Sequence, residues 1–172
     1  SWTGRHDLGD VVMSFVPDGW QASSSELADK TILVTGANRG IGEAVALSCA
    51  QHGAEVLLLG RDEASLTRVY DQIVDLGCPT PGIISLDLTT RDPALYDTLA
   101  DELSGAHVAL DGLVQNASVL GERRALAQTS PASWDEVLQV NMTAVFLLTR
   151  ALMPLLEAAP AASVVLTSSG VG

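Results

Sequence analysis

The sequence predicts an α/β fold, a doubly wound parallel sheet with helices on both faces. Two observations predict it. From Lys30 onward, short and nearly continuous apolar runs alternate with segments whose apolar residues recur at helical spacing. A glycine-rich turn separates the first apolar run from the first helical segment. Strands that alternate with helices pair in parallel through right-handed crossovers, which gives this fold class.

Residues 1–28 precede this alternation and show no hydrophobic period, because glycine, proline and serine interrupt them. We interpret them as an irregular N-terminal arm. Met13 is the expected natural start, which would make residues 1–12 an added extension. Residues 29–172 then form one α/β domain, in keeping with a total length of 172 residues.

Five strands are expected, at residues 31–35, 55–59, 82–86, 113–115 and 163–167. The last of them is expected to be an edge strand, because no further apolar run follows it in the sequence. The side chains of Val164, Val165 and Leu166 would then be exposed. Since an exposed apolar edge pairs with other chains, we expect these 172 residues to fold poorly in isolation.

Four helices are expected between the strands, at residues 40–52, 62–76, 93–104 and 131–158. Asp92 and Ser130 are the expected N-caps of the last two, each followed by proline at the first helical position. Gly105 is expected just past the end of the third helix, and Pro154 should kink the fourth. The second helix has an apolar stripe expected to lie in the core: Leu66, Val69, Ile73 and Leu76.

The composition excludes several classes of protein. A net charge of −12 argues against a nucleic-acid groove and against binding to an anionic membrane surface. The longest apolar stretch, residues 142–156, contains Arg150 and is too short to span a bilayer. The two cysteines have no neighbouring ligand cluster, so we expect reduced thiols, no metal site and a cytoplasmic protein.

The glycine-rich turn at residues 36–42 is the strongest local signal for a ligand. The unpaired N–H groups and partial positive charge at a helix N-terminus hold an anion such as phosphate. Glycine at positions 36, 40 and 42 permits close approach of a pyrophosphate and allows positive φ. The spacing, Gly-x-x-x-Gly-x-Gly, is neither the common dinucleotide fingerprint nor a Walker loop. A tight turn without a ligand is the alternative.

The residues that follow the other strands are further candidates. Ligands of open parallel sheets bind at the carboxyl ends of the strands. Besides the glycine turn, the segments at these positions are 60–61, 87–88, 116–118 and 168–169. Most of them are polar, glycine-rich or charged, as a binding edge requires.

Four segments, in order along this alternation, resemble motifs of the short-chain dehydrogenase/reductase family. They are Thr-Gly-Ala-Asn-Arg-Gly-Ile-Gly at 35–42, Asp-Gly-Leu-Val-Gln-Asn-Ala at 111–117, Val-Asn-Met at 140–142 and Leu-Thr-Ser-Ser-Gly-Val-Gly at 166–172. Residues 116–121 and 167–172 are most similar to its YciK-like branch. The resemblance covers residues 29–172. It implies a Rossmann-like sheet of order 3-2-1-4-5, with later strands missing from this chain, and a homo-oligomer at full length.

The resemblance also implies a catalytic set of Asn, Ser, Tyr and Lys, of which Asn141 and Ser169 match. In that family the serine orients the substrate carbonyl or alcohol, the asparagine holds a water, and the tyrosine is the acid/base assisted by the lysine. The Tyr-x-x-x-Lys motif is absent, since Tyr70 and Tyr96 have no lysine four residues on. Lys30, the only lysine, precedes the first strand. We therefore expect the 172 residues alone to lack reductase activity.

The cofactor-binding residues implied by the resemblance come from four strand ends. They are Gly36, Asn38, Arg39, Gly40, Ile41, Gly42, Arg61, Asp87, Leu88, Asn116, Ala117 and Ser118. Arg39 and Arg61 favour NADP, because arginines bind a 2′-phosphate and Gly60 stands where an acidic residue would select NAD. Ser118 departs from the family, which has glycine there.

Each candidate also has a structural alternative. Arg39 and Arg61 could be solvated surface arginines, and Asp87 could cap a turn. Asn116 could form an ordinary Asx turn, and Asn141 could be a satisfied buried amide.

Two functions follow from these predictions. The first is an NADP-dependent oxidoreductase that transfers a hydride between NADP(H) and a small carbonyl or alcohol substrate. The second is a non-catalytic module that binds a nucleotide or a protein partner. A downstream Tyr-x-x-x-Lys in a longer parent sequence would favour the first. The identity of the substrate is not encoded here, because the family's substrate loop lies beyond the last motif.

Overall fold

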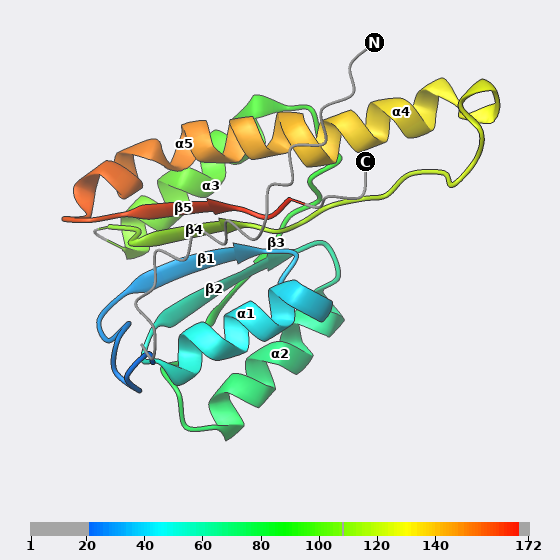
Figure 1. Cartoon of the computed structure of the whole chain (residues 1–172). Coiled ribbons are helices and arrows are strands. Elements are labelled where there is room, and N and C mark those ends of the chain that lie inside the picture. The colour runs from blue at the N-terminus through cyan, green and yellow to red at the C-terminus, as the bar shows by residue number, and fades with distance from the viewer. Residues whose placement is uncertain (1–20, 108, 169–172) are drawn as a thin grey trace, which may run out of the picture.

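A computed structural model of the chain describes residues 21–107 and 109–168, and shows three layers, helix, sheet and helix (Figure 1). The sheet is parallel, with the order β3-β2-β1-β4-β5. Its strands are β1 Thr31–Thr35, β2 Glu55–Gly60, β3 Gly82–Ser85, β4 Gly112–Gln115 and β5 Ser163–Leu166. The expected class and strand order are therefore confirmed.

Helices cover the two faces of the sheet (Figure 1). On one face lie α1 Gly40–Gln51 and α2 Glu63–Asp75. On the other face lie α3 Pro93–Ala106 and a long helix. This long helix consists of α4 Pro131–Leu138, the π-helical segment η2 Gln139–Thr143 and α5 Ala144–Ala158. A short 3₁₀ helix, η1 Leu126–Gln128, precedes it.

The alternation of side chains along the strands divides the core in two. Leu33 and Leu57 face the cluster under α3 and α5, whereas Val34 and Leu58 face the cluster under α1 and α2. Successive side chains of a strand point to opposite faces, so both clusters draw on the same continuous apolar runs. Aliphatic side chains fill most of both clusters, as the low aromatic content requires.

Several local predictions are corrected. Leu76 is 55% exposed, because it is the C-cap of α2 and lies beyond the buried stripe Leu66, Val69 and Ile73. Gly105 lies inside α3, which ends at Ala106. The expected fourth helix is interrupted by η2, for which the apolar period contained no signal. The side chains of Asp92 and Ser130 do cap α3 and α4 as expected.

Within the described residues, one helix is long and apolar enough to cross a membrane by length and composition, the 28-residue segment Pro131–Ala158. The helix extends on both sides beyond the apolar stretch 142–156 that the sequence analysis considered. Leu148 and Leu152, both fully buried, pack from this helix into the core beside the sheet. A core helix of an α/β domain satisfies the same criteria of length and apolarity.

The sheet is tied together at the amino ends of β1 and β4. Lys30 Nζ donates to Asp111 Oδ1 at 2.8 Å, and the Thr31 N–H donates to Asp111 Oδ2 at 3.1 Å. Burial raises the pKa of Asp111, but these two donors and the charge of Lys30 outweigh it, so the net shift is downward. The only lysine of the chain therefore lies at the amino edge of the sheet, opposite the carboxyl ends of the strands.

Candidate functional site

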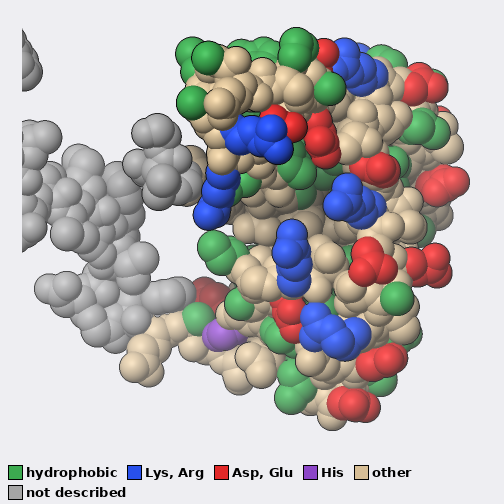
Figure 2. Space-filling view, turned by 90° about the vertical axis from the view of Figure 1, so that its right-hand side faces the viewer, with side chains coloured by type: hydrophobic (Ala, Val, Ile, Leu, Met, Phe, Trp, Pro, Cys, Tyr) green, Lys and Arg blue, Asp and Glu red, His purple; other side chains and the backbone are tan. Residues whose placement is uncertain are grey.

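A cleft of about 670 Å³ opens at the carboxyl ends of the strands. Its volume is within the range of small-molecule sites. Figure 2 views this side of the molecule, where basic side chains spread across the face among acidic ones. The lining residues come from the ends of β1 to β4, from the first turns of α1 and α2 and from η2: Gly36, Asn38, Arg39, Gly40, Ile41, Gly60, Arg61, Asp62, Ser65, Leu86, Asp87, Leu88, Thr89, Asn116, Ala117, Ser118, Val119 and Val140.

The glycine turn connects β1 to the N-terminus of α1, and its glycines have different roles. Gly36 and Gly40 have positive φ values of 65° and 59°. A Cβ at Gly42 would lie 2.2 Å from the Gly36 carbonyl oxygen, so Gly42 is required for packing inside the turn. A Cβ at Gly40 would meet no atom within 4 Å. Gly40 therefore leaves space beside the first N–H groups of α1, where a phosphate group fits.

Charged side chains of both signs line the cleft beside this turn. Arg39 lies at the start of α1 and Arg61 follows β2, and both are exposed. Asp62, the N-cap of α2, also lines the cleft, which the sequence analysis missed. It accepts a hydrogen bond from the Ser65 hydroxyl, which lowers the pKa of Asp62 and favours its charged form. Its position directly after Arg61 was the available signal.

The turn after β3, residues 86–90, forms one wall of the cleft. Asp87 Oδ1 accepts from the Thr89 N–H at 3.0 Å, and the Asp87 carbonyl accepts from the Thr90 N–H at 3.1 Å. The turn-capping alternative for Asp87 is therefore correct, and the residue lines the cleft as well. Beneath the turn, the Tyr96 hydroxyl donates to the Thr90 carbonyl at 3.3 Å. Burial and then the charge of Asp87 raise the pKa of Tyr96, which favours the protonated donor.

The end of β4 is bonded to the end of β1. Thr35 Oγ1 accepts from the N–H groups of Asn116 at 2.9 Å and Ala117 at 3.0 Å. The Asn116 amide donates to the Thr35 carbonyl at 3.3 Å, so it holds the two strands together beside the cleft. Ala117 packs on the glycine turn, since a Cβ at Gly36 would lie 3.0 Å from its Cα. Ser118 lines the cleft and is exposed.

Asn141 lies in η2, and its side chain makes a two-bond clamp. Its Oδ1 accepts from the Val119 N–H and its Nδ2 donates to the Val119 carbonyl, both at 2.9 Å. Its amide is therefore satisfied by the backbone, which is the structural alternative from the sequence. Val119 lines the cleft, so Asn141 contributes to the cleft by holding the backbone of Val119 in place. The other predicted catalytic residue, Ser169, lies outside the described residues.

Two further residues of η2 were missed by the sequence analysis. Val140 lines the cleft. Gln139 is 4% exposed, and its amide donates to the carbonyls of Leu88 and Thr90 in the turn after β3. A glutamine and an asparagine on either side of Val140, at the start of the apolar part of the helix, were the available signal. No group of three or more metal-binding side chains lies together among the residues that the structure describes.

Comparison with known proteins identifies similar chains. The sequence profile described as short chain dehydrogenase matches residues 30–172. The uncharacterized oxidoreductase YciK of Escherichia coli K12 is 40% identical over 153 residues, which are 89% of this chain and 61% of that protein. A solved short chain dehydrogenase from Pseudomonas syringae is 47% identical, with a TM-score of 0.86 over 89% of this chain and 63% of that one.

A third similar protein was solved with a ligand. This short chain dehydrogenase from Escherichia coli CFT073, complexed with NADPH, is 40% identical with a TM-score of 0.84. The match covers 87% of this chain and 62% of that one. The chain therefore spans a little over three fifths of the length of these three relatives.

Proposed function

Since the chain belongs to the short-chain dehydrogenase family, we propose that its cleft binds NADP(H). We also propose that the protein transfers a hydride between this cofactor and a small carbonyl or alcohol. One observation carries the choice of cofactor: Arg39 and Arg61 both line the cleft beside the glycine turn. A 2′-phosphate is close to doubly negative, and arginine offers it a planar set of donors.

The cleft fits the parts of this cofactor in order. The open position at Gly40 and the N-terminus of α1 suit the pyrophosphate. The arginines at the ends of β1 and β2 suit the phosphorylated ribose, with Asn38 and Ile41 beside them. Leu88 and Asp87 would flank the adenine, and residues 116–118 the nicotinamide. The NADPH complex of the relative from Escherichia coli CFT073 supports this assignment.

When bound, the nicotinamide supplies or accepts the hydride, and the residues of this chain bind and orient. Asn141 would hold Val119 in place at the nicotinamide end, and Ser169 would orient the substrate oxygen. Neither tyrosine is followed by lysine at the fourth position. Lys30 is paired with Asp111, and the Tyr96 hydroxyl is bonded to Thr90. We therefore expect the 172 residues alone to bind NADP(H) without turnover.

Titration of both cofactors, by calorimetry or fluorescence, tests the proposal, and the intact parent protein is used if residues 1–172 alone are unstable. We expect NADPH to bind at least ~10-fold more tightly than NADH, or about 1.4 kcal/mol. The double variant Gly60→Asp/Arg61→Ala should reverse this order, because a carboxylate repels the phosphate and accepts from the ribose hydroxyls. A Cβ at Gly60 would lie 3.4 Å from Leu66 Cδ2, so the new side chain can be accommodated.

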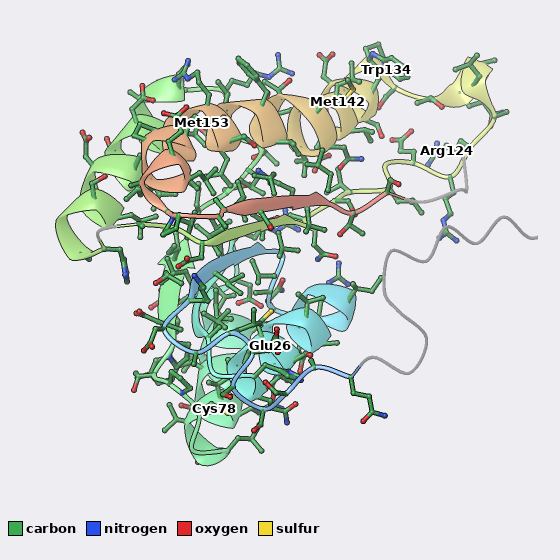
Figure 3. All side chains as sticks on the ribbon, turned by 60° about the vertical axis from the view of Figure 1, so that its left-hand side comes forward. Glu26, Cys78, Arg124, Trp134, Met142 and Met153 are labelled. Carbon is green, nitrogen blue, oxygen red and sulfur yellow. The ribbon has the colours of Figure 1, made fainter. Side chains whose placement is uncertain are left out.

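Arg124→Ala is the matched control for that titration, because Arg124 is exposed and lies outside the cleft-lining set (Figure 3). It should leave the ratio of the two affinities unchanged. Equal affinities in the wild type, or an unchanged ratio in the double variant, would show that Arg39 and Arg61 are only surface charges.

A non-catalytic nucleotide-binding or partner-binding module is the second candidate. The observation that favours it is the engagement of Lys30 and Tyr96 in contacts of the fold. Turnover of carbonyl compounds with NADPH by a longer parent protein that carries Tyr-x-x-x-Lys would exclude this candidate. Binding of NADPH without turnover by that parent would support it.

We also expect a homo-oligomer for the full-length protein. Four apolar side chains on the long helix are exposed: Trp134, Met142, Phe146 and Met153. Figure 3 shows Trp134 on the side of the helix that faces away from the sheet, and labels Met142 and Met153 farther along the same helix. Burial of such a face between subunits is favourable.

A further inference from the structure

Three consecutive residues of η2 contact the cleft, the turn after β3 and the segment after β4. Gln139 bonds the turn after β3, Val140 lines the cleft, and Asn141 bonds Val119 after β4. Successive side chains of a helix point in different directions, so three neighbouring residues can contact three different parts of the structure. The π-helical turn therefore contacts both the turn after β3 and the segment after β4. Isolated π turns in helices often occur at functional sites.

Gln139 is more deeply buried than Asn141, the other polar residue of η2 that bonds the cleft lining. Its Nε2 donates to the Thr90 carbonyl at 2.6 Å and to the Leu88 carbonyl at 3.4 Å. The side chain is 4% exposed, so water cannot readily replace it as a donor. The turn also has its own Asp87 cap and the bond from the Tyr96 hydroxyl, and the exposed side chain of Arg91 lies 3.8 Å from Asp135 of α4 in a surface ion pair. Gln139 thus connects this wall to the long helix.

The position of the wall in the sheet shows which part of a ligand it contacts. The order β3-β2-β1-β4 places the turn after β3 next to the end of β2, which carries Arg61. The segment after β4 lies on the other side of β1. In the proposed function, the phosphorylated adenosine half of NADP(H) lies on the Arg61 side. The wall held by Gln139 then contacts that half.

We propose that Gln139 is a positioning residue for the adenosine half of the cofactor. Its amide holds the backbone of Leu88 and Thr90, and so sets the position of the side chains of Asp87 and Leu88 in the cleft. This inference rests on the proposed function. It assigns to the η2 glutamine an effect on cofactor affinity that is separate from its contribution to folding.

The test uses 2′,5′-ADP, which carries the adenosine half alone, together with NADPH. We expect Gln139→Leu to weaken both ligands at least ~10-fold, because the leucine cannot donate to either carbonyl. Gln139→Glu should weaken both ligands at pH 8 and recover part of the loss at pH 5.5. A protonated carboxyl can donate one hydrogen bond to the Thr90 carbonyl, whereas a carboxylate cannot.

Gln115→Leu is the matched control. Gln115 is 5% exposed, and its Nε2 donates to the Val145 carbonyl at 3.4 Å and to Thr149 Oγ1 at 3.2 Å in the same long helix, outside the cleft. Both leucine variants should lower the free energy of unfolding, but Gln115→Leu should leave the affinity for 2′,5′-ADP within ~2-fold of the wild type. Urea unfolding followed by circular dichroism would compare the two losses of stability.

The possible outcomes separate this inference from the proposed function. A wild type that binds neither 2′,5′-ADP nor NADPH would contradict the proposed function itself. A wild type that binds both, with equal losses of affinity in Gln139→Leu and Gln115→Leu, would overturn only the role of Gln139. If Gln139→Leu does not fold, the pH profile of Gln139→Glu decides: a profile parallel to that of the wild type overturns the inference, and recovery at low pH supports it.

Discussion

Single glycines differ in whether they tolerate a side chain, as Gly42 beneath the cleft and Gly105 in α3 show. A Cβ at Gly42 would lie 2.2 Å from the Gly36 carbonyl oxygen and 2.6 Å from the Asn116 amide nitrogen. Gly105 lies near the end of α3, is exposed, and has no atom within 4 Å of its would-be Cβ. The first position requires glycine for packing, and the second does not.

The prediction at this scale compares two identical substitutions. Gly42→Ala should displace the glycine turn and abolish measurable NADPH binding, because backbone and not a flexible side chain opposes the new methyl group. Gly105→Ala should raise the free energy of unfolding by about 0.5–1 kcal/mol, since alanine has the higher helix propensity. Titration with NADPH and urea unfolding of both variants provide the measurements. NADPH binding by Gly42→Ala at wild-type affinity would contradict the packing argument.

At the scale of elements, an ion pair joins α2, α1 and the glycine turn. Arg68 of α2 donates to the two carboxylate oxygens of Glu43 of α1, at 2.7 and 2.9 Å. The same guanidinium donates to the Asn38 carbonyl at 3.0 Å. The hydrogen bond from Arg68 lowers the pKa of Glu43, and the smaller effect of burial opposes it. Arg68 therefore holds α2 against α1 and, at the same time, against the backbone of the glycine turn.

This ion pair predicts a pH dependence. Because the pKa of Glu43 is lower in the folded state, its contribution to stability is fully present above the unfolded pKa, about 4.3. It is lost as the pH falls through the folded value. The difference in unfolding free energy between the wild type and Glu43→Gln should thus be constant near neutral pH and shrink below about pH 4. Urea unfolding of both proteins at a series of pH values measures this difference in unfolding free energy. A difference that does not change with pH would show that the ion pair is not the source of the stabilisation.

At the scale of the whole molecule, the edge strand β5 exposes apolar side chains. Val164, Val165 and Leu166 of β5 are 45%, 51% and 62% exposed, although β5 pairs fully with β4. An apolar edge strand is a template for pairing with another chain. The exposure expected from the sequence is confirmed, whereas poor folding in isolation stays a prediction.

Association in solution tests the consequence. Residues 1–172 should associate with increasing concentration, and Val165→Lys should reduce this, because a charged side chain on an edge strand opposes further pairing. Leu76→Lys is the control, since Leu76 is 55% exposed but lies at the end of α2. Light scattering over a range of concentrations measures the mass. A wild type that stays monomeric, or an equal effect of both lysines, would contradict association through β5.

The sequence by itself determined the fold class, the boundaries of the predicted elements to within two residues except at η2, and most of the cleft. These features depend on local patterns: strands on continuous apolar runs, caps on Asp92 and Ser130, and the glycine turn on three glycines whose spacing is visible in one segment. The twelve predicted cofactor-binding residues come from the four strand ends, because parallel strands bring their carboxyl ends to one edge. Eleven of them line the cleft, and Gly42 packs beneath it.

Only the tertiary structure decided which side chains support that cleft. Gln139 reaches Leu88 across 51 positions, and Asn141 reaches Val119 across 22. No local period encodes such contacts, and a glutamine in a helix has the same propensity whether it bonds a wall of the cleft or water. The tertiary structure likewise decided that Asp62, at the start of α2, lines the cleft. It also decided that Leu76, at the end of α2, is exposed to solvent. The π-helical turn was not visible in the sequence, because the apolar pattern around it fits an uninterrupted α-helix equally well.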